Sequence, residues 1–299
     1  MAHAVTRRTA LGLAAAAVAA GTVGCSGNPQ AVYDGNRGDS RTVVIGYIGW
    51  DENIANSYLW KELLERKGYR VQLMNLEAAA LYAGVASGQL DVFMAATPQI
   101  HADYWDRFGK DFAVVGQWLD HVIQGIAVPT YVPVRSTDEL KGREAELGGR
   151  IIGIEAGSGL MRFIHENAVG DYELQGYEIV DGSTPAMLAA LDKALSKKEP
   201  IAVTLWKPHW AFAKYPMRLL KDPEGSFGGS DVLKVIGSKR FVSRNGPVSR
   251  ALAKFHMTPE EIGSLELEIT DAGRGKEQEA VRRWVDQNEK AVRPWTAEL

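Results

Sequence analysis

The chain has 299 residues, of which 45% are hydrophobic and 24% are charged, a composition typical of soluble globular proteins that bury a sizeable core. Its 34 basic and 37 acidic side chains give a net charge of −3, so nothing in the charge balance indicates a nucleic-acid partner. The composition argues against extensive disorder and allows one to three domains of ordinary size.

The N-terminus has the three-part pattern of an export signal. A short basic segment with Arg7 and Arg8 is followed by an alanine-rich apolar run and then by small residues. The run is too short to span a membrane, so we expect a signal peptide over residues 1–24. The segment around the arginines resembles a twin-arginine export motif, but Ala10 stands where phenylalanine is usual. Twin-arginine and Sec export therefore both stay open.

The only cysteine, Cys25, directly follows this signal. Residues 22–25 (TVGC) resemble a bacterial lipobox, with Thr22 in place of the usual leucine, and a lone cysteine cannot form an internal disulfide. We therefore expect Cys25 to carry lipid; the alternative is that it belongs to a discarded leader. Residues 25–41 are polar and rich in turn formers, which predicts a flexible tether.

From Thr42 onward, short β-branched runs alternate with helical patterns. The expected strands of the first half are 43–47, 71–74, 91–94 and a run near 113–116, and the expected helices are 53–66 and 78–87. Strand-helix-strand units of this length predict a mostly parallel sheet covered by helices.

The same alternation begins again after Tyr131. The expected strands are 151–154, 177–180 and 201–205. The expected helices are one that opens at a capping box at 136–139, one at 160–168 and one at 185–196 that is capped by Ser183 or Thr184. Two more helices are expected near the C-terminus, one that starts at 258–261 and an amphipathic one at 276–291. Two α/β units in one chain predict two lobes. Ligands of such folds bind at the carboxyl ends of strands and in clefts between domains.

The sequence contains no GxSxG, P-loop, HExxH or paired-cysteine motif. Its six histidines are scattered without metal-ligand spacing, so we predict no metal site and no cofactor. Missing motifs do not exclude an enzyme, but they favour a binding protein.

Three tryptophans follow predicted strands. Trp50 comes after the first strand, Trp118 after the strand near 113–116, and Trp206 after the strand 201–205. One tryptophan at a strand end is usually a packing residue. Three at equivalent ends favour an aromatic cage for an organic cation, to which each ring contributes about 0.5–2 kcal/mol.

Residues 154–161 (IEAGSGLM) read as a strand, a glycine-containing turn and a helix start. The free amides of Gly159 and Leu160 are candidates to bind an anion, although the glycines are also explained by a tight turn alone. His101 is a candidate third donor; taken alone, it would be read as a surface histidine. Rings for a cation together with donors for an anion describe a site for a small zwitterion.

Five segments are distinctive: 46–69, the strand DVFM (91–94) with His101 downstream, 125–132, GIEAGSGLM (153–161) and, above all, LWKPHWAFAKY (205–215). In collinear order over residues 42–291, the chain resembles the glycine betaine (quaternary ammonium) substrate-binding proteins of ABC importers. The resemblance implies an α/β, two-lobed, periplasmic-binding-protein-like (type II) fold, in which each lobe is a mostly parallel sheet flanked by helices and the ligand lies in the interlobe cleft. Lobe I would comprise residues 42–130 plus 207–299, and lobe II residues 131–206.

The resemblance also implies residue roles. Trp50 and Trp206 would form two walls of the cage, Gly159 and Leu160 would give backbone amides to the ligand carboxylate, and His101 would give a side-chain donor. The segment Pro208–Trp210 would form the crossing between lobes. The chain would be a monomeric, non-enzymatic lipoprotein at the outer face of the cytoplasmic membrane, delivering a betaine to an ABC permease and its ATPase for osmoprotection or nutrition.

One position departs from the family pattern, because Ala96 stands where a third cage tryptophan is common, five residues before His101. Either Trp118 fills the gap, or the pocket suits a bulkier ligand such as carnitine. A choline binder is a rival reading, with Asp51 as partner of the choline hydroxyl, although Asp51 is also explained as a cap of the helix near Glu52. A secreted enzyme acting on a small amine and a structural or adhesion lipoprotein are the alternatives from other classes.

Overall fold

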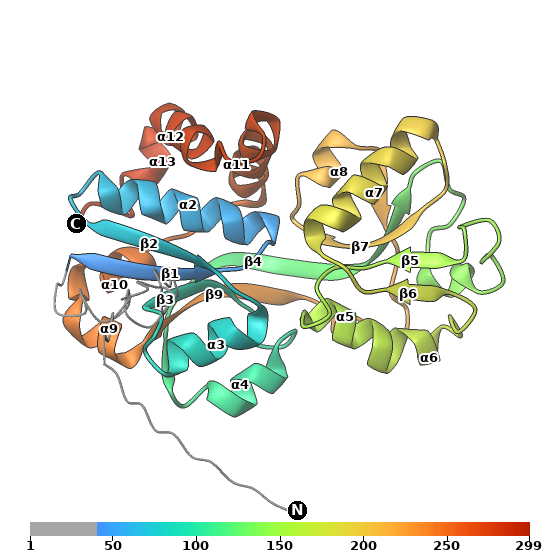
Figure 1. Ribbon diagram of the computed structural model, residues 1–299, viewed down its shortest axis with the longest axis horizontal. Coiled ribbons are helices and arrows are strands. Elements are labelled where there is room, and N and C mark those ends of the chain that lie inside the picture. The colour runs from blue at the N-terminus through green and yellow to red at the C-terminus, as the bar shows by residue number, and fades with distance from the viewer. Residues whose placement is uncertain (1–40) are drawn as a thin grey trace, which may run out of the picture. The chain divides into compact units, whose positions relative to one another are not determined.

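The structure is a computed structural model that describes residues 41–299 (Figure 1). The predicted signal peptide 1–24, Cys25 and all of the tether except Arg41 lie outside the described residues. Among residues 41–299 no helix is both long enough and apolar enough to cross a membrane.

The described strands form one continuous sheet in the order β2-β1-β3-β9-β4-β7-β5-β6, and β8 pairs with β4 off this path. Their bounds are β1 (Thr42–Tyr47), β2 (Arg70–Asn75), β3 (Val92–Ala96), β4 (Phe112–Pro129), β5 (Arg150–Ile152), β6 (Glu178–Val180), β7 (Ala202–Lys207), β8 (Met217–Leu219) and β9 (Asp231–Ser238).

The helices of the described residues cover both faces of the sheet (Figure 1). Their bounds are α2 (Asp51–Glu65), α3 (Ala78–Ala86), α4 (Ala102–Phe108), the 3₁₀ helix η1 (Thr137–Leu140), α5 (Gly159–Phe163), the π-helical turn η2 (Ile164–Ala168), α6 (Val169–Asp171), α7 (Thr184–Lys197), α8 (Ala211–Lys214), α9 (Lys239–Arg244), α10 (Gly246–Ala253), α11 (Pro259–Ala272), α12 (Glu277–Gln287) and α13 (Glu289–Val292).

Parallel pairing is confined to two groups of strands. β1 pairs in parallel with β2 and β3, and β5 pairs in parallel with β6 and β7. The 18-residue strand β4 and its partner β9 lie between the groups and pair antiparallel with their neighbours. The sequence predicted the strands of the two parallel groups, but of β4 it predicted only a short strand near 113–116. The rest of β4 was missed because it pairs antiparallel with its neighbours and is not part of the strand-helix-strand alternation on which the prediction was based.

The lobe boundaries stay a prediction. β8 (Met217–Leu219) pairs with the end of β4 at Ala127–Pro129, and the sequence assigned both segments to lobe I. At Ala127, β4 also pairs with Val203 of β7, so β7 and β8 flank this part of β4 on opposite sides.

The sequence predicted a capping box at residues 136–139 and a helix start at 258–261, and the structure has a capping box only at the second of these positions. At the start of α11 the Thr258 side chain accepts from the Glu261 N–H while Glu261 accepts from the Thr258 N–H. At residues 136–139 the prediction was wrong. Ser136 donates to the Asp138 carboxylate instead of capping the backbone, and only the four-residue helix η1 follows.

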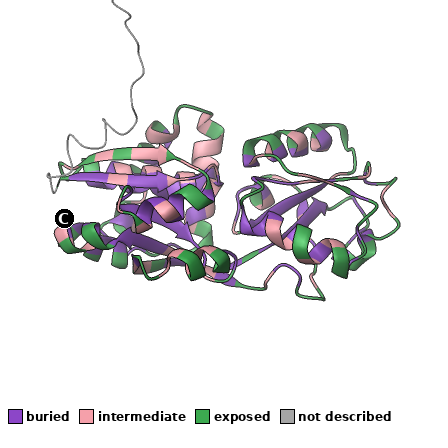
Figure 2. Ribbon diagram, turned by 60° about the horizontal axis from the view of Figure 1, so that its bottom comes forward, coloured by how far each residue is buried: buried purple, intermediate pink, exposed green. Residues whose placement is uncertain are grey.

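The apolar core lies on the central strands and the inward faces of the helices (Figure 2). α2 packs on the sheet and is covered by α11 and α12. Trp60 of α2 meets Phe255 edge-on with ring centroids 5.4 Å apart, and Phe255 in turn stacks on Trp118 at 5.2 Å. At the amino end of α2, the Asn53 side chain accepts from the Ile48 N–H over 3.0 Å and so ties the helix start to the residues that follow β1.

Candidate ligand-binding site

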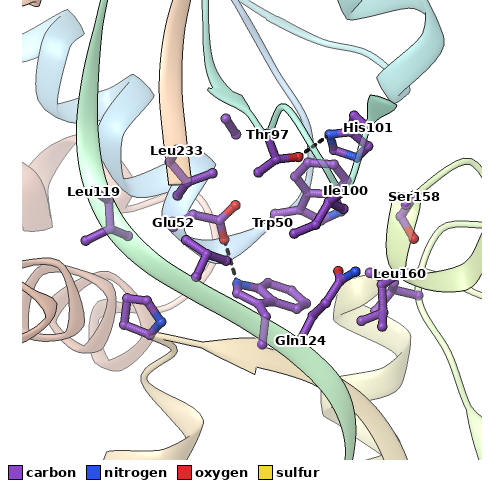
Figure 3. Close-up of a pocket in the computed structure, with 16 residues that line it drawn as sticks. Trp50, Glu52, Thr97, Ile100, His101, Leu119, Gln124, Ser158, Leu160 and Leu233 are labelled. Atoms are coloured by element: carbon purple, nitrogen blue, oxygen red, sulfur yellow. Dashed lines mark hydrogen bonds between the residues drawn. The ribbon is translucent and has the colours of Figure 1, made fainter. Parts of the chain in front are cut away.

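A pocket lies where the carboxyl ends of β1, β3 and β7 meet the start of α5, with β4 and β9 along one side (Figure 3). It combines aromatic, polar and aliphatic side chains, as small-molecule sites usually do. Its lining consists of Trp50, His101 and Trp206; Glu52, Thr97, Gln124 and Ser158; and Ala95, Ile100, Leu119, Val122, Ile154, Gly159, Leu160, Pro208 and Leu233.

Two of the predicted cage tryptophans, Trp50 and Trp206, line this pocket, and each is tied to a buried carboxyl group. The Trp50 indole Nε1 donates to Glu155 Oε2 over 3.2 Å, and the Trp206 indole Nε1 donates to Glu52 Oε2 over 3.0 Å. The two indoles are 7% exposed. With their N–H groups satisfied and their positions fixed, the rings can offer their π faces to a ligand.

His101 forms a third aromatic surface and stacks on Trp50, with ring centroids 5.4 Å apart and an interplanar angle of 11°. Its Nδ1 lies 2.7 Å from the Thr97 hydroxyl and 3.2 Å from the Tyr82 hydroxyl, whereas its buried Nε2 has no partner among the described residues. Burial, with a smaller contribution from Arg162, lowers the pKa of His101 to about 3, so the ring is neutral at pH 7.

A neutral imidazole carries one proton. Since both hydroxyl groups can donate to Nδ1 of His101, we assign the proton to Nε2. His101 therefore presents an unused, buried N–H donor at the pocket wall. An anionic oxygen of a ligand would satisfy it.

The start of α5 supplies further donors. Ser158 is the N-cap of α5, and its Oγ accepts from the Met161 N–H over 3.2 Å. The N–H groups of Gly159 and Leu160, at the first helical positions, have no acceptor within the helix. Both residues line the pocket, as the sequence predicted for an anion site.

Gly159 is required by a close approach of two segments. A Cβ atom added there would lie 2.2 Å from the carbonyl oxygen of Ile100. The Arg162 guanidinium donates to this same oxygen over 2.9 Å. α5 therefore packs directly on the loop that carries His101.

The structure does not bring Trp118 to the pocket. Its side chain is fully buried, its Nε1 donates to the Met94 carbonyl over 2.6 Å, and its ring stacks on Phe255. Ala96, at the third-tryptophan position of the family pattern, is also fully buried, and the neighbouring Ala95 lines the pocket in its place. Trp118 thus belongs to the core, and the aromatic lining within residues 41–299 comes from Trp50, Trp206 and His101.

Asp51 has neither of the roles that the sequence suggested. The N-cap of α2 is Trp50, Asp51 is already helical, and it does not line the pocket. Its Oδ1 accepts from the Trp210 indole over 2.7 Å, and its Oδ2 lies 3.2 Å from His209 Nε2. Asp51 instead holds the segment Pro208–Trp210 against α2.

Sequence reasoning missed two polar residues of the pocket, Glu52 and Gln124. Glu52 is 4% exposed, and burial raises its pKa to about 8, with Asp51 and Glu155 adding to the shift. Its place in the sequence could have indicated a pocket residue, because Glu52 lies in the first turn of the helix that follows the first strand and ligands bind at strand ends. Gln124 lies in the second half of β4, which no sequence pattern revealed.

Within residues 41–299 no group of three His, Cys, Asp or Glu side chains could hold a metal ion. The pocket instead offers ring faces, one imidazole donor, two backbone donors and one carboxyl group. Such a set of aromatic faces and a few polar groups suits a small organic molecule.

Comparisons with known proteins agree with this geometry. Residues 41–287 match the model of the substrate-binding domain of ABC-type glycine betaine transport systems. The glycine betaine/carnitine transport binding protein GbuC of Listeria monocytogenes is 32% identical over 161 residues, and that alignment covers 53% of each protein, so the chain spans about half the length of this relative.

Two solved structures have the same fold. Lactococcal OpuAC, in its closed conformation with glycine betaine, has a TM-score of 0.79 and 30% identity, and the match covers 85% of this chain and 99% of that one. The glycine betaine/L-proline-binding protein ProX of Borrelia burgdorferi also has a TM-score of 0.79 and 30% identity, over 85% and 96% of the two chains. The predicted periplasmic-binding-protein-like α/β fold is confirmed.

Proteins of this kind are extracytoplasmic binding components of ABC transporters, so the prediction that the chain is not an enzyme is confirmed and the secreted-enzyme alternative falls. The family model extends over residues 41–287, nearly all of the described part of the chain. The chain therefore belongs to the family of substrate-binding domains of ABC-type glycine betaine transport systems.

Proposed function

We propose that this chain is the lipid-anchored binding protein of an ABC importer and that its ligand is a betaine, which carries a quaternary ammonium and a carboxylate. One observation supports the proposal above the others: the two indoles of Trp50 and Trp206 and the unpartnered Nε2 of His101 line the same pocket. This pocket pairs surfaces for a cation with a donor for an anion.

In the proposed complex the ammonium group lies against the faces of Trp50 and Trp206, each contributing about 0.5–2 kcal/mol. The carboxylate accepts from His101 Nε2 and from the Gly159 and Leu160 amides. Hydrogen bonds to a charged group contribute about 1.5–3 kcal/mol each. Together these contacts recognise both ends of the zwitterion.

The rest of the lining favours a betaine larger than glycine betaine. Leu119, Val122 and Leu233 give the pocket an aliphatic side, and Trp118 does not close it as a third wall. Alkyl substituents on the ligand would bury apolar area there at about 25 cal/mol per Å². Carnitine and proline betaine have such substituents, and carnitine appears in the name of the Listeria relative.

Choline is a second candidate, which Glu52 favours. A carboxyl group beside an indole of the cage suits a ligand with net positive charge, and choline lacks the carboxylate that Glu52 would repel. Asp51 cannot serve as the hydroxyl partner proposed from the sequence, because it lies outside the pocket; Gln124 takes that position in this reading.

The anchor and partners follow from the N-terminal pattern and the family. We propose that the signal peptide 1–24 is removed, that lipid on Cys25 holds the protein at the outer face of the cytoplasmic membrane, and that the loaded monomer docks on a permease driven by an ATPase. A Cys25→Ser variant would then leave the membrane fraction and lose incorporation of labelled fatty acid. Unchanged partitioning would refute the anchor.

A thermal-shift screen of the purified chain against glycine betaine, proline betaine, carnitine, choline and ectoine tests the ligand class. Ligand at 100 times its dissociation constant should stabilise the folded state by about 2.7 kcal/mol. A larger shift with carnitine or proline betaine than with glycine betaine supports the aliphatic side of the pocket as the determinant. No shift with any of them would refute the betaine assignment and favour a structural lipoprotein.

A further inference from the structure

We propose that Glu52 releases a proton when the pocket takes up a quaternary ammonium, so that its carboxyl is neutral in the empty pocket and ionised in the complex. The inference rests on the proposed function and makes Glu52 a specificity-determining residue that favours ligands of net positive charge. The step is a simple ionisation: the O–H bond of the carboxyl breaks, the electron pair stays on oxygen, and the proton passes to buffer.

The position of Glu52 supports this role. Its side chain is 4% exposed and lines the pocket, and its Oε2 accepts from the Trp206 indole N–H over 3.0 Å. Figure 3 shows the carboxyl directed into the pocket beside Trp50 and Leu233. A cation held against the Trp206 ring would therefore lie close to a carboxyl group that water scarcely reaches.

The groups around Glu52 do not supply a compensating positive charge. Asp51 precedes it on α2, Glu155 approaches from the segment after β5, and Glu266 faces the same region from α11. His209, on the segment after β7, contacts Asp51 and not Glu52. Among the ion pairs of residues 41–299, none joins a lysine or arginine to Glu52, so a ligand is the available partner for its negative charge.

The protonation state of the empty pocket follows from this environment. Burial raises the pKa of Glu52 to about 8, and the acids beside it act in the same direction. At pH 7 the neutral form of Glu52 therefore predominates in the empty pocket. An opposite charge within about 4–6 Å lowers the pKa of a carboxyl by about 1–3 units, which is enough to ionise Glu52 when the cation arrives.

The consequence for affinity has a defined sign. Between the pKa of Glu52 in the complex and its higher pKa in the empty pocket, binding releases a proton, so the dissociation constant falls as pH rises, by at most about tenfold per pH unit. Above about pH 8 the empty pocket is already ionised, and the affinity becomes independent of this group. Choline should show the larger effect, because the carboxylate of a betaine partly opposes the negative charge on Glu52.

Ionisation also strengthens the cage itself. A charged Glu52 is a better acceptor for the Trp206 N–H than a neutral one, and the bond polarises the indole toward a more negative face. Trp50 and Glu155 form an equivalent pair on the other wall. Glu52 therefore acts on a bound cation in two ways: through its own charge and through the Trp206 ring to which it is hydrogen-bonded.

Calorimetry on the purified full chain tests the proposal. Glycine betaine, carnitine and choline are titrated at pH 7 in buffers of different ionisation enthalpy, which yields the protons released per ligand bound, and dissociation constants are measured from pH 6 to 9. The variants are Glu52→Gln, whose amide oxygen can still accept from Trp206, and Glu266→Gln as matched control. Glu266 is also a buried acid whose pKa is raised, but it does not line the pocket.

The wild type and Glu266→Gln should each release most of one proton with choline, and Glu52→Gln should release none from this source. Glu52→Gln should also lose most of the rise in choline affinity between pH 6 and 8. With a betaine, His101 can also take up a proton, and this uptake is the same in the wild type and in Glu52→Gln. The difference between the two proteins in protons released per ligand bound therefore comes from Glu52 alone. Equal release in both, or loss of release in Glu266→Gln alone, would overturn the proposal.

Infrared spectroscopy gives a readout that does not depend on Glu52→Gln folding. The ligand-free Glu266→Gln variant at pH 7 should show the C=O band of a protonated carboxyl, and ligand should remove it. Binding without proton release or band loss would refute the role of Glu52 and leave the betaine assignment standing. No binding of any tested ligand would overturn both.

Discussion

Gly159→Ala should weaken ligand binding and also destabilise the folded protein. Gly159 begins α5 and lies against the loop that carries His101, and an added Cβ would meet Ile100 at its carbonyl oxygen (2.2 Å), its Cγ2 (2.4 Å) and its carbonyl carbon (2.9 Å). Real Cβ atoms do not approach closer than 3.0 Å, so the two segments must separate by at least 0.8 Å at the carbonyl oxygen, the difference between 3.0 and 2.2 Å.

The size of the effect follows from this overlap. Inserting one methyl group into a packed contact costs about 1–3 kcal/mol. The separation also lengthens the 2.9 Å bond from Arg162 to the Ile100 oxygen and moves the Gly159 amide away from His101. If this cost falls on the ligand-bound arrangement, the dissociation constant rises about 5- to 150-fold. The same overlap is present in the described structure, so Gly159→Ala should also lower the free energy of unfolding, by up to about 1–3 kcal/mol.

Isothermal calorimetry measures the dissociation constant of the ligand found in the screen, and urea unfolding without ligand measures stability. Gly157→Ala is the matched control, since a Cβ there would meet only the Tyr104 hydroxyl at 3.9 Å, an ordinary contact. Gly157→Ala should bind as the wild type does. If Gly159→Ala also binds with wild-type affinity, the close approach of α5 to Ile100 is not part of the binding arrangement, and the reasoning fails.

Four further variants have expected outcomes. Trp206→Ala should weaken ligand binding, measured by calorimetry, by at least the roughly 0.5–2 kcal/mol of one cation–π contact. Trp118→Phe should leave the affinity unchanged but lower the free energy of unfolding by roughly 1–3 kcal/mol, because the hydrogen bond to the Met94 carbonyl is lost. The pKa of Glu52 is raised from 4.5 to about 8, so its contribution to stability is present below pH 4.5 and is lost as pH rises through 8. The free energy of unfolding of Glu52→Gln, measured with urea, should therefore depend less steeply on pH over that range than that of the wild type. An unchanged pH dependence would contradict this. Thr258→Ala removes the capping box of α11 and should cost about 0.5–2 kcal/mol, with ligand affinity as the internal control.

Local interactions explain what was predictable from the sequence. The Ser183 and Thr258 caps lie within a few residues of the amides they bind, so both helix starts were visible in the sequence. Trp50 and Trp206 could be placed at strand ends because β1 and β7 are short strands with at least one parallel neighbour each. The donors Gly159 and Leu160 could be placed because a strand, a turn and a helix start are local patterns.

The outcome for Trp118 shows where local pattern fails. β4 is 18 residues long, and its pairing with β9 shifts register between Val114 and Gly116, between Gln117 and Leu119, and again before Val122. Each shift changes which side chains face the pocket, because a one-residue slip reverses the faces of a strand. Leu119 therefore lines the pocket while Trp118 is buried in the core.

The sequence by itself determined the order of the elements, the caps of the helices and the strand ends at which a ligand would bind, since these depend on residues close together in the chain. Only the tertiary structure decided the chemistry of the pocket. Glu52 meets Trp206 across 154 positions, and Trp50 meets Glu155 across 105. Burial and hydrogen bonding between such distant residues set the proton state of Glu52, and both arise only when the chain has folded.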